Sequence, residues 1–201
     1  MKRLLLIVLP LLLMVGCEKN GLHTEYYENG QKWKEGNYKD GEIDGLYTEW
    51  YKNGQKSDEG NYKDDKEEGL WAGWLENGQK SYETTYKDGK EIEKTSWTYY
   101  ENGQMKYEWN YKDGKKDGLT TIWYENGQKN YEENYKDGNR DGLWTEWYKN
   151  GQKRYEWNYK DEKLDGLFTI WYENGQKMFE KNYKDGILIS KKGWEYDGSV
   201  M

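Results

Sequence analysis

The chain has 201 residues, with 31 basic and 38 acidic side chains and a formal net charge of −7. This balance argues against nucleic acid and bare anionic lipid as partners, because both bind through an excess of Lys and Arg. Leu, Ile, Val and Phe supply only about a tenth of residues 17–201, but all 12 Trp and 21 Tyr lie there. Because large rings bury much surface, we expect a folded chain with an aromatic core.

The first 17 residues have the pattern of an export signal. Lys2 and Arg3 precede an apolar run from Leu4 to Val15. As a helix this run would extend roughly 18 Å, well short of the ~30 Å core of a bilayer, so a transmembrane span is not expected. Residues 13–17, Leu-Met-Val-Gly-Cys, resemble the lipobox of bacterial lipoproteins.

That resemblance implies a lipoprotein signal peptide at residues 1–16 and acylation of Cys17, the only cysteine. Residues 17–20 would then be a lipid-anchored tether. We therefore expect a protein of the bacterial cell envelope that is anchored to a membrane, at the outer membrane or the cell surface.

Residues 21–186 contain an internal repeat. Asn-Gly-Gln-Lys, or a one-letter variant, occurs seven times, at spacings of 24, 24, 25, 24, 24 and 24 residues. A fixed period of this length indicates a repeat architecture, in which each copy is one small unit that packs on its neighbours. The tetrapeptides begin at Asn29, Asn53, Asn77, Asn102, Asn126, Asn150 and Asn174.

Each repeat is predicted to be a hairpin. Asn-Gly between β-prone runs favours a type I′ turn, and Asp-Gly, as at Asp113 and Gly114, favours the same turn. Glycines and turns leave no window for a helix of ordinary length. The prediction is an all-β chain, an elongated, twisted antiparallel meander of seven hairpin repeats with about fourteen strands.

The turn at Asn150 and Gly151 predicts which residues pair and which face each shares. The predicted pairs are Tyr148 with Lys153, Glu146 with Tyr155 and Trp144 with Trp157. The other face carries a set that hardly changes between repeats, such as Leu143, Thr145 and Trp147, which we interpret as packing.

The face with Trp144 varies more, and varying rings on a regular scaffold are what a binding surface would look like. Cross-strand packing explains the same rings, so both interpretations stay open. The candidate ligand or partner surface comprises Tyr47, Trp71, Trp109, Trp144, Tyr155, Trp157 and Phe168.

Two places depart from the regular pattern. Gly73 lies within a strand, and Asp-Gly-Leu is replaced by Glu93, Lys94 and Thr95, so a bulge or bend is predicted near residues 90–97. After Gly186 the sequence predicts a closing strand at residues 187–189 and a charged cap. Residues 187–201 are thus expected to form a C-terminal capping segment.

Catalysis and metal binding find little support in the sequence. His23 is the only histidine and occupies the slot of Tyr47, so it is interpreted as a substituted strand residue. Neither a Ser-His-Asp nor a Cys-His arrangement can be built from one histidine and one cysteine. Because the carboxylates recur with the hairpins and no pair stands apart, we expect no enzyme activity, no metal and no cofactor.

The pattern Asp-Gly-Leu-x-Thr-x-Trp-Tyr-x-Asn-Gly-Gln-Lys resembles the bacterial variant of the MORN repeat. The resemblance implies an elongated sheet that acts as a structural or protein-binding scaffold. Some bacterial members are labelled antitoxin-like, so an antitoxin or immunity role is one alternative. Another is binding of glycan or cell wall, by analogy with the aromatic hairpin repeats of surface proteins that bind choline or cell-wall polymers.

Overall fold

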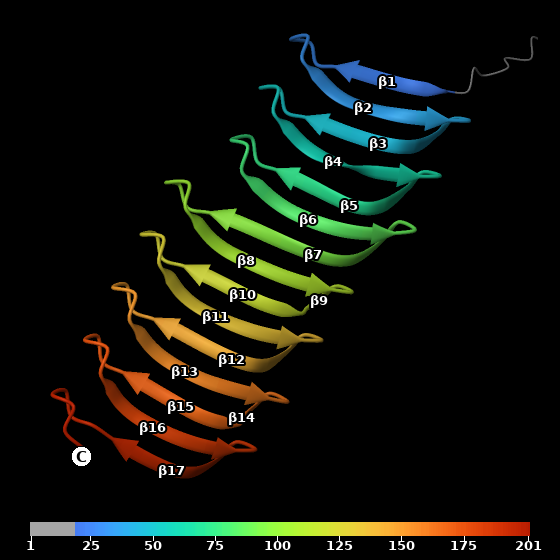
Figure 1. The fold of residues 1–201 in the computed structure, drawn as a ribbon. Coiled ribbons are helices and arrows are strands. Elements are labelled where there is room, and N and C mark those ends of the chain that lie inside the picture. The colour runs from blue at the N-terminus through green and yellow to red at the C-terminus, as the bar shows by residue number, and fades with distance from the viewer. Residues whose placement is uncertain (1–18) are drawn as a thin grey trace, which may run out of the picture.

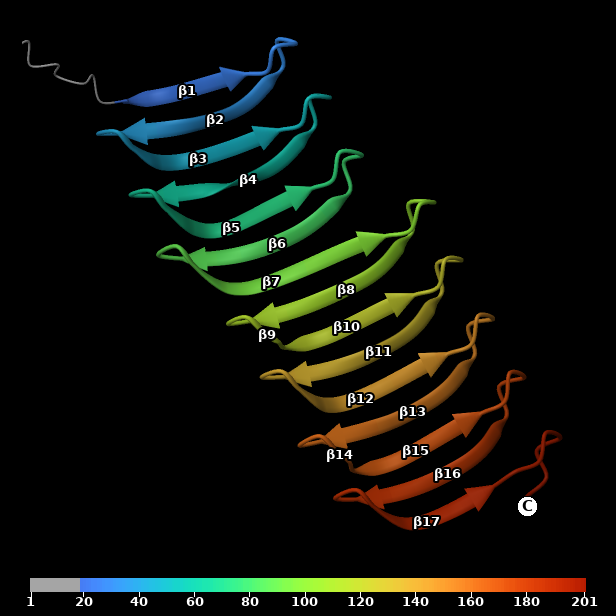
Figure 2. The same ribbon diagram turned by 180° about the vertical axis from the view of Figure 1, so that it is seen from behind.

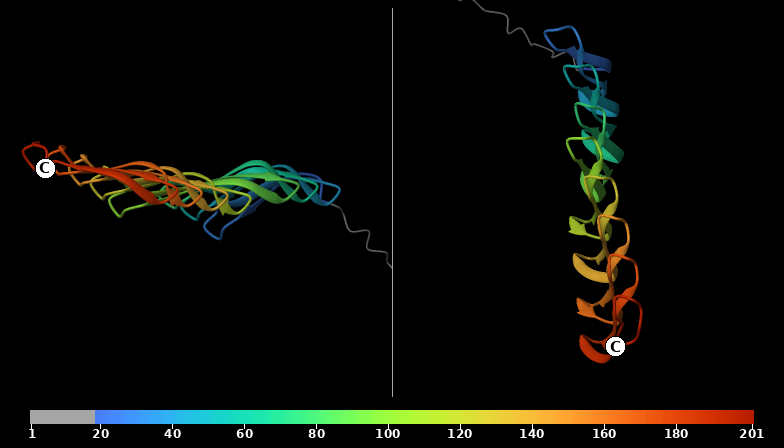
Figure 3. Two further views of the ribbon diagram at one scale, coloured as in Figure 1. Left: turned by 90° about the horizontal axis from the view of Figure 1, so that it is seen from below. Right: turned by 90° about the vertical axis from the view of Figure 1, so that its left-hand side faces the viewer.

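The computed structural model describes residues 19–201, so the predicted signal peptide at residues 1–16 and Cys17 lie outside the described residues. All strands of residues 19–201 belong to one sheet (Figure 1, Figure 2). Each strand pairs antiparallel with its neighbours along the chain. Figure 3 shows the sheet as a single twisted layer, with neither face covered by another element of the described chain. The predicted all-β meander is confirmed.

Seventeen strand segments occupy fifteen positions, because β9 with β10 and β14 with β15 are each one strand split in two. The fifteenth position is β17, which follows the seven predicted hairpins. The segments are β1 (Gly21–Tyr26), β2 (Lys32–Lys39), β3 (Glu42–Trp50), β4 (Lys56–Lys63), β5 (Lys66–Trp74), β6 (Lys80–Lys87), β7 (Lys90–Tyr99), β8 (Met105–Lys112), β9 (Lys115–Lys116), β10 (Gly118–Trp123), β11 (Lys129–Lys136), β12 (Asn139–Trp147), β13 (Lys153–Lys160), β14 (Lys163–Leu164), β15 (Gly166–Trp171), β16 (Lys177–Lys184) and β17 (Ile187–Gly193).

The turns that contain aspartate have the predicted geometry. At Asp113 and Gly114 the φ angles are 47° and 74°, so both central residues are left-handed, as a type I′ turn requires. Two of the seven turns place a bulkier residue at the second position, Asp65 at φ 57° and Glu162 at φ 62°. A side chain with a Cβ is strained in this region.

The Asn-Gly turns do not have the predicted geometry. Only Gly151 has a positive φ in the sixth loop, and Gly151 N donates to Tyr148 O at 2.9 Å while Tyr148 N donates to Gln152 O at 2.8 Å. This is a three-residue loop, a type I turn closed by a left-handed glycine, rather than a type I′ turn. The same two bonds recur in all seven loops.

The loop changes the register next to it. Trp144 pairs with Trp157 and Glu146 with Tyr155, as predicted. The predicted pair of Tyr148 with Lys153 is wrong, because Lys153 lies opposite Trp147 and one extra residue, Arg154, bulges from the second strand.

A bulge occurs in every repeat and not only near residues 90–97. Two extra residues precede Tyr47, around Gly45 at φ 114°, and the equivalent positions of the regular repeats also carry a glycine with positive φ. The irregular strand β7 has no glycine there and accommodates one extra residue, Ile92, so the predicted bulge is present but smaller. Because bulges bend strands, they account for the bowed hairpins in Figure 1.

Strand β17 forms the last edge of the sheet. Its register places Lys191 opposite Lys181 and Lys192 opposite Glu180. These two lysines occupy the positions that Phe168 and Thr169 hold in the preceding repeat, so both packed rows end in a charged group. Lysine on an edge strand disfavours pairing with another chain.

The described residues form no helix that is long and apolar enough to cross a membrane.

We predict that Glu162→Gly raises the free energy of unfolding by about 0.5–1 kcal/mol. The change removes the strain of a Cβ at φ 62°, partly offset by the greater freedom of glycine in the unfolded chain. Urea unfolding followed by tryptophan fluorescence measures the effect. The matched control is Gly114→Glu, at the same turn position with open space around it, which should lower stability. Equal stability of all three proteins would contradict the strain.

Candidate functional site

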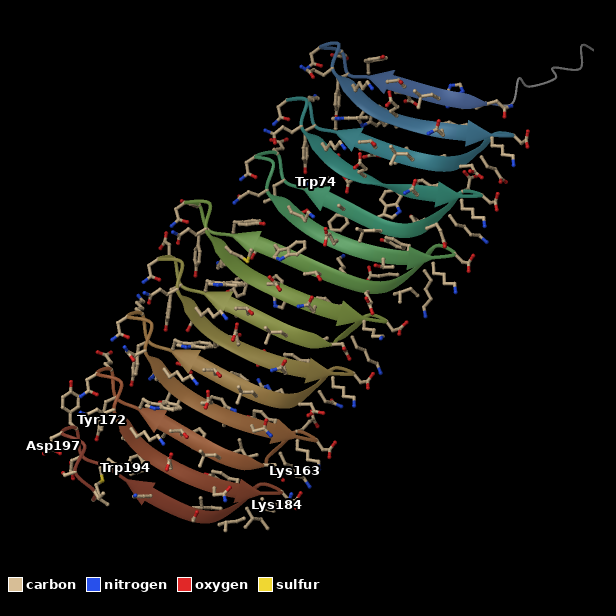
Figure 4. The ribbon with its side chains drawn as sticks, in the orientation of Figure 1. Trp74, Lys163, Tyr172, Lys184, Trp194 and Asp197 are labelled. Carbon is tan, nitrogen blue, oxygen red and sulfur yellow. The ribbon has the colours of Figure 1, made fainter. Side chains whose placement is uncertain are left out.

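The hairpin ends form two different long edges of the sheet. We call the edge with the Asn-Gly loops the asparagine edge and the edge with the aspartate turns the aspartate edge. Figure 4 shows Trp74, Tyr172 and Trp194 along the asparagine edge, and Lys163 and Lys184 along the aspartate edge.

The asparagine edge carries hydrogen bonds that join each repeat to the next. In the fifth loop Asn126 Oδ1 accepts a bond from Gln128 N at 3.1 Å, and Asn126 Nδ2 donates to Lys149 O of the next loop at 3.0 Å. Six of the seven loop asparagines donate to the following loop in this way, at 2.8–3.3 Å. One side chain therefore fixes both the shape of its loop and the position of its neighbour.

A tyrosine beside six of the seven asparagine loops adds a second bond between repeats. Tyr124 Oη donates to Trp147 O at 2.8 Å, and the equivalent bond forms in six repeats at 2.7–3.2 Å. Burial raises the pKa of Tyr124 and of Tyr51 above the ordinary value. The third repeat has Leu75 here and lacks the hydroxyl.

The glutamine of one loop also packs on the glycine of the next loop. A Cβ added at Gly54 would lie 2.6 Å from Gln31 Oε1, so the close packing at this position requires glycine.

An eighth loop follows β17. Glu195 N donates to Ser199 O at 2.8 Å and Ser199 N to Asp197 Oδ1 at 2.9 Å, which repeats the bonds of the seven asparagine loops. It accepts bonds from Tyr172 and Asn174 of the seventh repeat. Asp197 replaces the asparagine, and its carboxylate has no N–H to donate, so the row of bonds ends there.

The seven candidate surface residues all lie on one face, which we call the ring face, but the structure divides them into groups. The ring centroids of Tyr47 in β3 and Trp71 in β5 lie 6.2 Å apart, and Trp71 is only 7% exposed. Trp109 stacks on Tyr107 at 4.9 Å. The largest group comprises Trp144, Tyr155, Trp157 and Phe168, with centroids 5.0–6.3 Å apart where they touch.

Two large rings on this face each lie over a glycine of the neighbouring strand. Gly60 lies beneath Trp71, where a Cβ would come within 2.1 Å of the indole. Gly73 likewise makes room for Tyr82, so this glycine serves ring packing rather than a bend. Trp144 instead stacks on both Tyr131 and Trp157, at 5.5 and 5.0 Å. The rings of this face are therefore largely occupied with one another.

One acidic group stands apart from its copies, contrary to the prediction. Glu133 is 4% exposed and is the one buried carboxylate of residues 19–201. Tyr135 Oη donates to it at 2.6 Å, and Arg140 Nε lies 3.6 Å from its other oxygen. Burial and the bond to Glu133 raise the pKa of Tyr135 to about 12. The cluster is a buried carboxyl group that accepts one hydrogen bond and lies near one guanidinium.

The opposite face, which we call the threonine face, combines a buried row with an exposed one. Thr48, Thr121, Thr145 and Thr169 are 3–4% exposed, which confirms packing for this row. The leucines two residues earlier are exposed instead, between 37% and 61%, so the predicted packing is wrong for them. We call this row the leucine stripe; its members are Leu22, Leu46, Leu70, Leu119, Leu143 and Leu167.

His23 lies in β1, where its ring contacts Tyr38 edge to face at 5.2 Å. This is the strand position that the sequence predicts for it. No group of three or more His, Cys, Asp or Glu side chains in residues 19–201 is arranged to hold a metal ion.

The hairpins closed by the asparagine loops coincide with matches to a known family. The family described as MORN repeat variant matches residues 19–40, 43–64, 67–88, 98–113, 116–137, 140–161 and 164–185. The chain belongs to the MORN repeat variant family. Its fourth MORN unit is the short one, and the match begins within β7, after the irregular bulge. No curated protein matches the chain.

We predict that Asn126→Asp lowers the free energy of unfolding by about 1–2 kcal/mol, because the carboxylate keeps the loop acceptor but loses the bond to Lys149 O. Thermal unfolding followed by circular dichroism measures the loss. Asn77→Asp is the control, since Asn77 Nδ2 donates to Gln79 of its own loop, and it should lose less than half as much. Equal losses would contradict the role of the bond between repeats.

Proposed function

We propose that this MORN-repeat chain is a membrane-anchored lipoprotein of the bacterial cell envelope whose sheet is a scaffold for a protein partner, with no catalytic step. The leucine stripe carries the proposal. It provides one exposed leucine per regular repeat, in a row along one face of a single-layer sheet. A single exposed leucine is ordinary, but a row of six at regular spacing offers a repeated set of apolar contacts to one extended partner.

The surroundings of the stripe fit a protein partner. Each leucine pairs across the strands with a polar residue, as Leu119 does with Asn134 and Leu143 with Asn158. An apolar centre with a polar rim is the usual composition of a protein interface. The stripe has two halves of three leucines, separated at the irregular repeat. There Thr95 occupies the position of the leucine and donates a hydrogen bond to Asn110 Oδ1.

The ring face favours a protein partner over a glycan, because the ring of Trp144 is already stacked on both of its neighbours. A sugar that stacks on Trp144 would compete with Tyr131 and Trp157, which already stack on it. Glycan binding through Trp144, Tyr155, Trp157 and Phe168 is therefore the alternative, and the experiment below distinguishes it from protein binding at the stripe.

Anchoring at Cys17 would hold the first strand of the sheet close to the membrane. Three residues separate Cys17 from β1, so at about 3.4 Å per residue the first strand would start within roughly 10 Å of the membrane. Fifteen strand positions at about 4.8 Å would then extend the scaffold some 65 Å outward or along the surface.

We predict that a photoreactive amino acid at position 119 or 143 forms a cross-link to one defined protein in the native cell. Placed on the ring face at position 181, it should not. Triple substitution Leu119→Ser, Leu143→Ser and Leu167→Ser should abolish co-purification of that protein with little loss of stability, because the side chains are exposed. Mass spectrometry of the cross-linked product identifies the partner.

The control for the leucine variant is Leu75→Ser, which alters an exposed leucine outside the stripe and should retain the partner. Retention by the triple variant would overturn the protein-binding proposal. Saturable binding to a glycan array that is lost in Trp144→Ala would favour the alternative.

We predict that the chain incorporates radiolabelled palmitate and that Cys17→Ala abolishes the label and releases the protein from membranes. Cys17 is the only thiol, so a thioester or thioether to the lipid has no other site. Label that survives Cys17→Ala would contradict anchoring at this residue.

A further inference from the structure

The seven asparagine loops share a dipeptide that can react with itself. In Asn-Gly, the backbone nitrogen of the glycine attacks the side-chain carbonyl carbon of the asparagine. The new bond joins Gly N to Asn Cγ, the Cγ–Nδ2 bond breaks, and ammonia leaves with the amide proton. Water then opens the succinimide to aspartate or isoaspartate, so the net reaction consumes one water and releases one ammonia. Asparagine is among the thermolabile residues for this reason.

The glycine nitrogen does not distinguish the loops from one another. In each loop it donates to the backbone carbonyl three residues earlier, at 2.8–2.9 Å, for example Gly78 N to Leu75 O and Gly127 N to Tyr124 O. The glycine φ angles are also alike, from 82° to 84°. Any difference in reactivity must come from the restraint on the asparagine side chain.

That restraint differs at one position. Six asparagines hold Nδ2 on a backbone carbonyl of the next loop, which cannot follow the side chain when it rotates. Asn77 Nδ2 donates to Gln79 Oε1, a side-chain group of its own loop, at 2.7 Å. Gln79 Nε2 makes the bond to the next repeat instead, to Gly103 O at 2.7 Å.

The sequence explains why the third loop is the exception. The spacing from Asn77 to Asn102 is 25 residues rather than 24, so the next loop is displaced by one residue. Leu75 also replaces the tyrosine whose hydroxyl bonds the next repeat elsewhere. The junction between the third and fourth repeats therefore lacks both regular bonds of the asparagine edge.

We propose that Asn77 is a selective site of spontaneous deamidation in the folded protein. The eighth loop shows that the aspartate product fits this geometry, because Asp197 Oδ1 accepts a bond from Ser199 N at 2.9 Å. At Asn77 the amide nitrogen that leaves is bonded within its own loop, to Gln79 Oε1, and not to the next repeat. Asn174 ranks second, because its bond to Tyr196 O is the longest of the six at 3.3 Å.

The experiment incubates the full-length protein at mildly alkaline pH and follows all seven loops by peptide mass spectrometry. Asn77 Nδ2 has a side-chain acceptor in its own loop where Asn126 Nδ2 has a backbone acceptor in the next loop. If this exchange removes the restraint of about one hydrogen bond, the rate at Asn77 is about fivefold above that at Asn126. Five loops share the tetrapeptide Glu-Asn-Gly-Gln, so the comparison is matched in local sequence. The five tetrapeptides begin at Glu28, Glu76, Glu101, Glu125 and Glu173.

A second incubation in concentrated urea provides the control. Without the fold, Asn29, Asn77, Asn102, Asn126 and Asn174 should deamidate at equal rates. An excess at Asn77 in the folded protein that disappears in urea supports the proposal. Equal rates in the folded protein, or an excess at Asn77 that persists in urea, would overturn it.

Discussion

The bond that six of the seven loop asparagines donate to the next loop is the interaction on which the structure most depends. A single-layer sheet has no second layer to bury its faces, so each repeat is stabilised only by its neighbours. Asn126 shapes its own loop through Oδ1 and positions the next through Nδ2. Because one side chain does both, the bond to the next loop depends on the spacing of 24 residues. Where the spacing is 25, after Asn77, the loop keeps its shape but the asparagine bond to the next loop is absent.

The two faces tolerate change to different degrees for the same reason. Ring packing is local, so a large ring needs only a small partner on the adjacent strand, as Trp71 has in Gly60. Another repeat can replace that pair by stacking Trp144 on Trp157. The threonine row has less freedom, because each Thr is enclosed between strands that the loops hold at a fixed distance, and it changes little from repeat to repeat.

The sequence predicts the parts of the fold that depend on local chemistry. The period, the strands, the type I′ aspartate turns and the pairing of Trp144 with Trp157 all follow from neighbouring residues. The Asn-Gly loop was predicted wrongly, because the dipeptide suits two loop types. The third loop keeps the three-residue geometry without the asparagine bond to the next repeat, so that bond does not select the loop type. All seven loops instead share a local bond from the glutamine N–H to the asparagine Oδ1. Burial of Glu133 was missed because it depends on Tyr135 and Arg140 across a bulge.

The exposure of the leucine stripe could not be predicted from the sequence either, since an unchanging apolar row normally indicates packing. The other recurring side chains have contacts within the sheet. Asparagine and tyrosine donate hydrogen bonds to the next repeat, glutamine packs on the glycine of the next loop, and threonine is buried. Leu143 recurs with them but is nearly half exposed. The recurring leucine side chain is therefore the one left partly open to a contact outside the chain, and we infer that the stripe, rather than the varied rings, is where the proposed partner binds.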